Sequence, residues 1–185
     1  MKTVFLFAPL LMALAPAFAT DYTQIQANKS SIAFSYKQMG VGMTGKFKKF
    51  SGQLSFNPEQ AAKAKTSFDV DLGSIDTGSP EANDEVGGKA WFSTKLFPVA
   101  HFASDSVKAI GGNRYEVAGK LTIKGKTQEV IVPATFSSQG KEGVFDGSFT
   151  IRRGDFSIGE GEWAKFDIVA NDINVKFRFT ATSGK

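Results

Sequence analysis

The clearest pattern in the chain is a strict alternation of apolar and polar residues near its C-terminal end. Between residues 173 and 180 the apolar positions are Ile173, Val175, Phe177 and Phe179, and every residue between them is polar. Successive side chains of a strand point to opposite faces, so this spacing places the apolar side chains on one face. The segment is therefore predicted to be a β-strand with one buried and one solvated face.

The same alternation recurs in seven earlier segments, so we predict an all-β fold. It would be a closed or nearly closed antiparallel sheet of eight strands with an aromatic interior. An extra residue at Lys48-Lys49 predicts a bulge that bends the second strand, and residues 22–25 are left open as a further strand. The inward positions of the seven segments are Ile32, Phe34 and Tyr36; Phe47, Phe50, Gly52, Leu54 and Phe56; Phe68, Val70 and Leu72; Ala100, Phe102 and Ser104; Tyr115, Val117, Gly119, Leu121 and Ile123; Val130, Val132 and Ala134; and Phe145, Gly147, Phe149 and Ile151.

Two short helices are predicted to interrupt the sheet. Asn57-Pro58 and Ser79-Pro80 each combine an N-cap residue with a proline at the first helical position. Alternation is absent from residues 79–92, and Gly87-Gly88 weakens the helix there, because a glycine inside a helix costs about 0.5–1 kcal/mol relative to alanine. We expect residues 79–92 to lie across one opening of the barrel as a mobile lid.

The first residues have the pattern of a secretory signal peptide. Lys2 precedes an apolar run from Val4 to Leu14, and a small-x-small cleavage site follows at residues 17–19. We expect cleavage after Ala19, a mature domain of residues 20–185, and a periplasmic location. The run is too short to span a membrane, which takes about 20 residues, so no stable membrane insertion is expected. The alternative, an uncleaved anchor or a lipoprotein, is disfavoured by the cleavage site and by the absence of cysteine.

Composition narrows the class of protein further. The chain has no cysteine, so it has no disulfides, thiol catalysis or thiolate metal site. Its formal net charge is only +4, and Lys46, Lys48 and Lys49 alternate with Phe47 and Phe50 as in an ordinary solvated strand face. Nucleic-acid binding usually needs basic residues gathered on one face, so we predict no nucleic-acid partner.

The residues for common enzyme mechanisms are also missing from the sequence. His101 is the only histidine, and no G-x-S-x-G elbow is present. Asp69 and Asp71 alternate as the outward half of a strand, and Asp76 is the polar residue of a turn, which disfavours a catalytic carboxylate pair. We therefore expect no enzymatic activity, no metal and no cofactor.

Several motifs, taken in order, resemble those of one bacterial family. They span nearly the whole predicted mature chain, and the set is specific although each motif alone is weak. The residues resemble the YceI-like, or polyisoprenoid-binding, proteins of bacterial periplasms. This resemblance implies an extended, lipocalin-like, eight-stranded antiparallel barrel that holds a long isoprenoid or acyl chain. The motifs are Gly45-Lys46-Phe47 with Gly52, residues 74–78 (SIDTG), Trp91-Phe92, residues 97–104 (FPVAHFAS), residues 119–125 (GKLTIKG), and residues 153–156 (RGDF).

The ligand is predicted to lie in the barrel lumen. Glycines at 52, 119 and 147 are interpreted as leaving width for a ligand, with the alternative that they only mark bends of a filled barrel. The expected ligand-binding residues are Phe34, Tyr36, Phe47, Phe68, Leu72, Trp91, Phe92, Phe102, Gly119, Leu121, Phe149, Arg153, Trp163 and Phe177.

The tryptophans and two arginines have two interpretations each. Trp91 and Trp163 lie in segments without alternation, where they either roof the opening or simply cap the core. A guanidinium at Arg152 or Arg153 would meet a pyrophosphate or a quinone carbonyl; the alternative is pairing with Asp155 or Asp172.

Together these observations predict a periplasmic binding or carrier protein for a polyisoprenoid-type lipid, such as a quinone or a prenyl phosphate. The only bound molecule expected is that lipid or isoprenoid quinone. The alternatives are an enzyme that acts on a lipid and a structural or interaction barrel with a filled core. The oligomeric state, including a homodimer, is left open.

Overall fold

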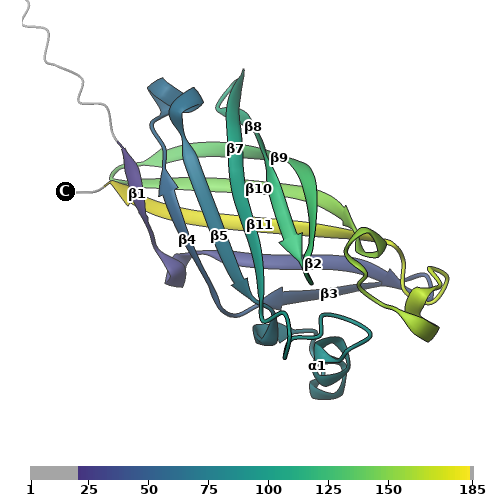
Figure 1. Cartoon of the computed structure of the whole chain (residues 1–185). Coiled ribbons are helices and arrows are strands. Elements are labelled where there is room, and N and C mark those ends of the chain that lie inside the picture. The colour runs from purple at the N-terminus through teal and green to yellow at the C-terminus, as the bar shows by residue number, and fades with distance from the viewer. Residues whose placement is uncertain (1–20, 184–185) are drawn as a thin grey trace, which may run out of the picture.

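The computed structural model describes residues 21–183, which form one curled antiparallel sheet of eleven strands (Figure 1). The strand order is β4-β5-β7-β8-β9-β10-β11-β2-β3-β6, and β1 pairs with β11. The predicted signal peptide lies outside the described residues. The strands are β1 (Tyr22–Ile25), β2 (Ser31–Gln38), β3 (Val41–Phe47), β4 (Phe50–Ser55), β5 (Lys65–Asp71), β6 (Ile75–Asp76), β7 (Val99–Gly111), β8 (Arg114–Ile123), β9 (Lys126–Gln139), β10 (Glu142–Arg152) and β11 (Asp172–Ser183).

All eight predicted strands are present, but the predicted count of eight is too low. The segment expected as one bent strand is divided at Lys48-Lys49 into β3, which pairs with β2, and β4, which pairs with β5. At this bend Lys48 N donates to Ser74 O at 3.1 Å, and Asp71 N donates to Lys49 O at 3.1 Å. The short β6 pairs with the end of β3, and residues 22–25 form β1. The bulge therefore marks the point where the chain exchanges one partner strand for another.

The sheet curls into a half-barrel, and β1 links its β4 edge to β11 (Figure 1). The long strand β11 pairs with β10 along its length, with β2 in its first half and with β1 at its end. From β1, Tyr22 N donates to Phe56 O at 2.8 Å and Phe56 N donates back to Tyr22 O at 3.1 Å. Because Phe56 follows β4, this bridge connects the β4 edge of the sheet to β11 through β1.

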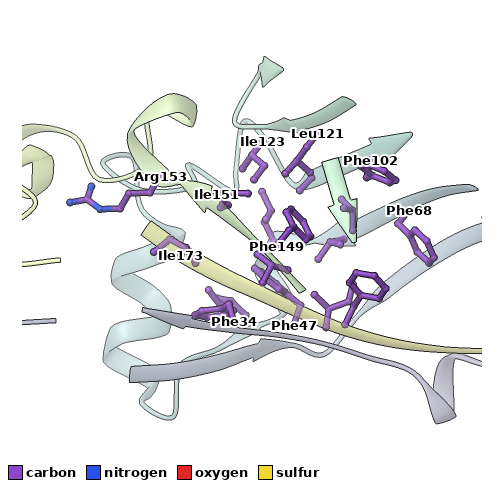
Figure 2. A pocket seen from close by; sticks show the side chains of 18 of the residues that line it. Phe34, Phe47, Phe68, Phe102, Leu121, Ile123, Phe149, Ile151, Arg153 and Ile173 are labelled. Carbon is purple, nitrogen blue, oxygen red and sulfur yellow. The ribbon is translucent and has the colours of Figure 1, made fainter. Parts of the chain in front are cut away.

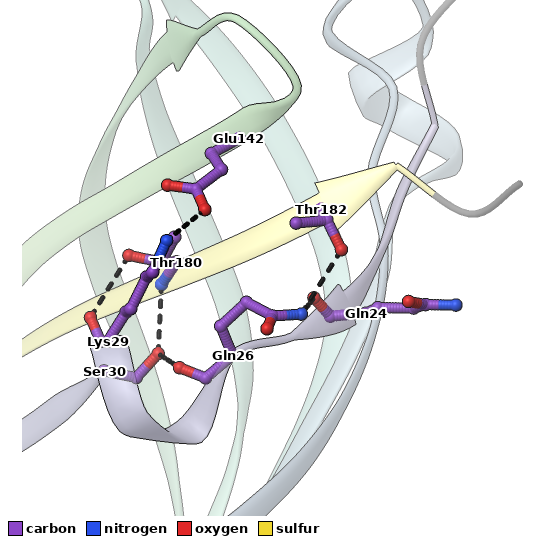
Figure 3. A network of polar contacts seen from close by, with 7 residues as sticks. All are labelled: Gln24, Gln26, Lys29, Ser30, Glu142, Thr180 and Thr182. Carbon is purple, nitrogen blue, oxygen red and sulfur yellow. Dashed lines mark hydrogen bonds and ion pairs between the residues drawn. The ribbon is translucent and has the colours of Figure 1, made fainter.

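Polar contacts hold the corner between β1 and β2 against β11 (Figure 3). The Ser30 hydroxyl donates to Gln26 O at 2.7 Å and accepts from Thr180 N at 3.0 Å. The Thr180 hydroxyl donates to Lys29 O at 3.1 Å, and the Lys29 ammonium pairs with Glu142. A side chain thus satisfies the β11 amide at the point where β11 changes partner from β2 to β1.

The helices are short and lie at the ends of strands. Asn57 caps the 3-10 helix η2 (Pro58–Lys63) by accepting from Glu59 N at 2.9 Å. Ser79 caps α1 (Pro80–Gly87) by accepting from Ala82 N at 3.3 Å. Both predicted helix starts are confirmed, and within residues 21–183 no helix is long and apolar enough to cross a membrane. The other 3-10 helices are η1 (Ala27–Lys29), η3 (Leu72–Ser74), η4 (Arg153–Phe156) and η5 (Gly161–Ala164).

Two buried clusters divide the interior. One gathers around the β1–β4 bridge, where Phe56 packs edge-to-face on Tyr115 with ring centroids 5.3 Å apart. The other lies toward η4 and the segment after α1, and it includes Leu72, Trp91 and Phe156. The space that the curled sheet leaves between these clusters is the candidate site.

Candidate functional site

The curled sheet encloses a cavity of about 360 Å³ (Figure 2). Its wall contains members of both buried clusters, such as Phe56 and Leu72, so the cavity reaches from one to the other. The wall is largely aliphatic and aromatic because it is built from the inward halves of alternating strands. Among the inward positions predicted from alternation, the wall includes Phe34, Phe68, Phe102, Leu121, Phe149 and Phe177.

All the residues expected to bind a ligand lie in this wall except Gly119. That residue pairs with Ser104 of β7, and the ring of Phe102 covers it: a Cβ at position 119 would lie 2.8 Å from the ring's Cζ. The placement of Gly119 in the wall was therefore wrong. That the remaining residues contact a ligand stays a prediction.

The interpretation that glycines leave free width is also corrected by the structure. A Cβ at Gly52 would lie 2.5 Å from Phe68 Cε1, and one at Gly147 would lie 2.7 Å from Phe177 Cε1. In both cases the glycine and the ring are direct partners across two strands. Glycine lets the partner's ring settle against the sheet, an arrangement that protects the backbone and pins the register. The space above these glycines therefore belongs to the rings.

Arg153 organises the loop at one end of the cavity. It is only 1% exposed, and its guanidinium donates to six backbone carbonyls. The shortest bonds, each 2.8 Å, run to Ile158, Trp163 and Val169. The longer ones reach Gly159, Lys165 and Ala170. Burial lowers the pKa of this guanidinium from its ordinary value, and arginine nevertheless stays charged in proteins.

Neither earlier interpretation of Arg153 matches this geometry. The alternative of pairing with Asp155 is confirmed for the exposed Arg152, at 2.9 Å, whereas within residues 21–183 no carboxylate pairs with Arg153. The donors of Arg153 are occupied by carbonyls, which leaves none for an anionic head group. Figure 2 shows its guanidinium pointing away from the cluster of Phe34, Phe149 and Ile151. The side chain of Arg153 forms part of the cavity wall, and its guanidinium holds the loop through hydrogen bonds to backbone carbonyls.

The two tryptophans lie together at the same end. Their ring centroids are 5.4 Å apart, and both rings line the cavity. The guanidinium of Arg153 lies over the Trp91 ring, 5.5 Å from its centroid, a distance typical of a cation–π contact. Lys124 ties the neighbouring loops by donating to Lys89 O at 3.1 Å and to Ser157 O at 2.7 Å. A hydrogen-bonded loop assembly thus holds the residues at this end of the cavity.

The segment predicted as a lid forms part of the wall. Helix α1 ends at Gly87, and the chain continues to Phe92 in turns. Ala82, Glu85 and Val86 of α1 line the cavity, yet the helix has no buried residue. Its side-chain anchor is Asn83, whose Oδ1 accepts from Thr77 N and from Thr77 Oγ1, both at 2.8 Å. The structure places this segment beside the cavity, and its mobility stays a prediction.

Few charged side chains line the cavity. In the part of the chain that the structure describes, the charged residues of the wall are Lys65, Glu85 and Arg153. Lys65 Nζ donates to Asp105 O at 3.1 Å, and Arg153 is bonded as above. Burial raises the pKa of the Tyr36 phenol, another wall residue, above its ordinary value. The cavity can therefore bury apolar surface but offers no unengaged cation.

The list of expected ligand-binding residues left out part of the wall. Ile123, Ile151 and Ile173 line the cavity (Figure 2), although the alternation of their strands had already placed them on the inward face. Glu85 and Val86 had no such signal, because a two-turn helix gives too short a pattern to show which side faces the cavity.

The titratable pair at His101 lies apart from this cavity. His101 Nδ1 is 2.6 Å from Asp69 Oδ1, both side chains are about half exposed, and neither lines the wall. Within residues 21–183 no group of three or more His, Cys, Asp or Glu residues could hold a metal ion.

Comparison with known proteins identifies the family. The model of the YceI-like domain matches residues 23–181. The chain belongs to the YceI-like family. A UPF0312 protein of Photorhabdus laumondii is 31% identical over 157 residues, which cover 80% of this YceI-like chain and 81% of the relative. The resemblance indicated by the motifs is confirmed.

Solved structures agree in fold. BcnA of Burkholderia cenocepacia is 43% identical with a TM-score of 0.84, and the match covers 86% of this YceI-like chain and all (100%) of BcnA. A polyisoprenoid binding domain from Saccharophagus degradans, implicated in plant cell wall breakdown, has a TM-score of 0.72 at 18% identity. That match covers 89% of this chain and 99% of the domain. At such low identity the second likeness shows the fold alone.

Proposed function

We propose that this YceI-like chain is a periplasmic binding or carrier protein that holds a long isoprenoid or other lipid chain in its cavity. The observation that carries the proposal is the apolar cavity inside the half-barrel, lined by rings from β2, β5, β7, β10 and β11. Each methylene-sized group that moves from water into such a wall gains about 0.8 kcal/mol. A slender apolar chain is the ligand that gains most from this geometry.

The size of the cavity favours a ligand site over a filled core. Small-molecule pockets usually measure about 300–1,000 Å³, and an engineered apolar cavity of about 150 Å³ already binds benzene. At about 360 Å³ this cavity is more than twice that engineered one. The alternative of a filled structural barrel is therefore disfavoured.

The family supports the choice of lipid and the absence of chemistry. A polyisoprenoid binding domain shares the fold, and among residues 21–183 the cavity wall brings together no nucleophile, base and orienting acid of the kind that hydrolases use. The cleavable N-terminal segment predicted from the sequence supports export to the periplasm. We infer a protein that sequesters or carries its lipid unchanged.

Solvent extraction and mass spectrometry test this proposal. Protein purified from the periplasm is extracted with organic solvent, and the delipidated protein is reloaded with a prenyl quinone. Val175→Phe, which adds volume to the wall, should reduce lipid recovery several-fold. Lys176→Phe, at the neighbouring position on the opposite face of β11, should not.

The outcomes separate the alternatives. Intact lipid recovered from the wild type and from Lys176→Phe, but not from Val175→Phe, supports a lumen carrier. Absence of lipid in the extract and failure to reload would contradict the proposal. Recovery of a chemically converted lipid would instead show an enzyme.

A further inference from the structure

One polar group in the cavity wall has no partner. The indole Nε1 of Trp91 is buried, and within residues 21–183 no hydrogen-bond acceptor reaches it. Trp91 as a whole is only 8% exposed. Buried donors are almost always paired, and indole nitrogen in particular usually finds an acceptor when buried. The unpaired donor in a cavity wall therefore calls for an explanation.

Three groups close to Trp91 in the structure do not serve as its acceptor. Arg153, which lies over the ring, carries donors only. Trp163 presents a second indole, which is also a donor. Ala90 O, one residue before Trp91, already accepts from Gly159 N at 2.9 Å and from Glu160 N at 2.7 Å. The groups around Trp91 are thus mostly donors, and the carbonyl of Ala90 is already engaged by two backbone amides.

We propose that the Trp91 indole N–H donates to an uncharged oxygen acceptor, such as a ketone or quinone carbonyl, at the polar end of the bound lipid. This rests on the proposed lipid-binding function and adds the class of head group. Once the lipid chain fills the apolar lumen, its oxygen-bearing end lies against the two tryptophans.

The charges of the wall favour a neutral head group over an anionic one. Arg153 is engaged by carbonyls and Lys65 by Asp105 O. Glu85, on α1, adds a negative charge to the wall. An anion at this end would meet no unengaged cation and would lose its hydration. A carbonyl loses little hydration and gains a buried hydrogen bond.

The test measures the NMR signal of the Trp91 indole proton directly. The chain has two tryptophans, so the ¹H–¹⁵N spectrum contains two indole signals, which Trp91→Phe and Trp163→Phe assign. Three probes are titrated into the delipidated protein: farnesylacetone, a hydrocarbon with the same skeleton in which a methylene replaces the carbonyl, and farnesyl phosphate. We expect the ketone to move the Trp91 indole proton downfield and the hydrocarbon to leave it nearly in place.

Affinities provide the second measurement. Trp91→Phe keeps an aromatic ring and removes the N–H. It should therefore weaken binding of the ketone by about five- to tenfold and leave binding of the hydrocarbon nearly unchanged. Trp163→Phe should preserve the preference for the ketone. The wild type should bind farnesyl phosphate more weakly than the ketone.

Each failure has its own meaning. If none of the three probes binds the wild type, the proposed lipid-binding function falls. If the probes bind but Trp91→Phe weakens ketone and hydrocarbon alike, or the indole proton does not respond to the ketone, the head-group inference is overturned while the function stands. Stronger binding of the phosphate than of the ketone also overturns it.

Discussion

Phe68 on β5 covers Gly52, the residue directly opposite it on β4, so that a Cβ at position 52 would lie 2.5 Å from the ring's Cε1. The same ring stacks on Phe179 of β11 with centroids 4.0 Å apart and planes at 11°. The glycine therefore lets a ring from one side of the curled sheet reach a ring on the other. This stack links β4 and β5 to β11 across the interior.

Gly52→Ala should destabilise the fold, because the added methyl group displaces Phe68 from its stack. We expect a loss of about 1–3 kcal/mol in the free energy of unfolding, typical of overpacking. In a Phe68→Ala background the same change should cost little, since alanine in a strand otherwise gains about 0.5–1 kcal/mol over glycine. Urea denaturation of the four proteins in this cycle measures the coupling.

Gly42 provides the matched control. It lies in β3, and a Cβ there would meet nothing within 4 Å. Gly42→Ala should therefore be neutral or slightly stabilising. Equal losses at positions 42 and 52 would show that the backbone, and not the ring of Phe68, requires glycine.

The adjacent arginines should differ sharply in their effect on stability. Arg153→Ala leaves several buried carbonyls unpaired and should cost about 3 kcal/mol or more. Arg152→Ala breaks only an exposed pair with Asp155 and should cost about 0–1 kcal/mol. Thermal unfolding monitored by circular dichroism compares the two variants with the wild type.

Arg153→Ala should also weaken binding of a neutral prenyl quinone and of a prenyl phosphate by similar factors, because the arginine shapes the wall and does not bind the head group. Calorimetric titration of both ligands measures this. A selective loss of the phosphate would restore Arg153 as a head-group residue.

Removal of bound lipid should lower the melting temperature. A ligand at about 100 times its Kd stabilises the native state by about 2.7 kcal/mol. For a domain of this size each kcal/mol shifts Tm by about 2–4 °C, so delipidation should lower Tm by about 5–10 °C. Differential scanning calorimetry before and after solvent extraction, with a reloaded sample as control, measures the change. A Tm that does not respond to reloading would argue against a lumen ligand.

Asn83→Ala should speed release of the lipid. The substitution removes the side-chain anchor between α1 and Thr77, and the two lost hydrogen bonds correspond to roughly a tenfold change. Transfer of a fluorescent prenyl probe to vesicles reports the release rate, and Asp84→Ala, an exposed neighbour on α1, is the control. Equal rates in the two variants would mean that the ligand enters elsewhere, such as past the loop at residues 159–163.

The sequence by itself determined which side of each strand faces inward. Phe34, Phe102 and Phe177 lie in the cavity wall as their alternation predicted, and the Ser79-Pro80 signal correctly started a helix. Such features depend on neighbours one to four residues away, because the strand period and helix capping are local. The family resemblance rests on the same short motifs.

The tertiary structure decided the glycine–ring contacts, the partners of each strand and the role of Arg153. Gly52 is covered by Phe68 only because β4 pairs with β5 in this register, and the division of one predicted strand into β3 and β4 depends on which partners each part meets. The six carbonyls that engage Arg153 lie between residues 158 and 170, so its role depends on the path of a loop whose sequence has no periodicity. Contacts between residues far apart in the chain require the whole sheet to be assembled, and no local pattern encodes them.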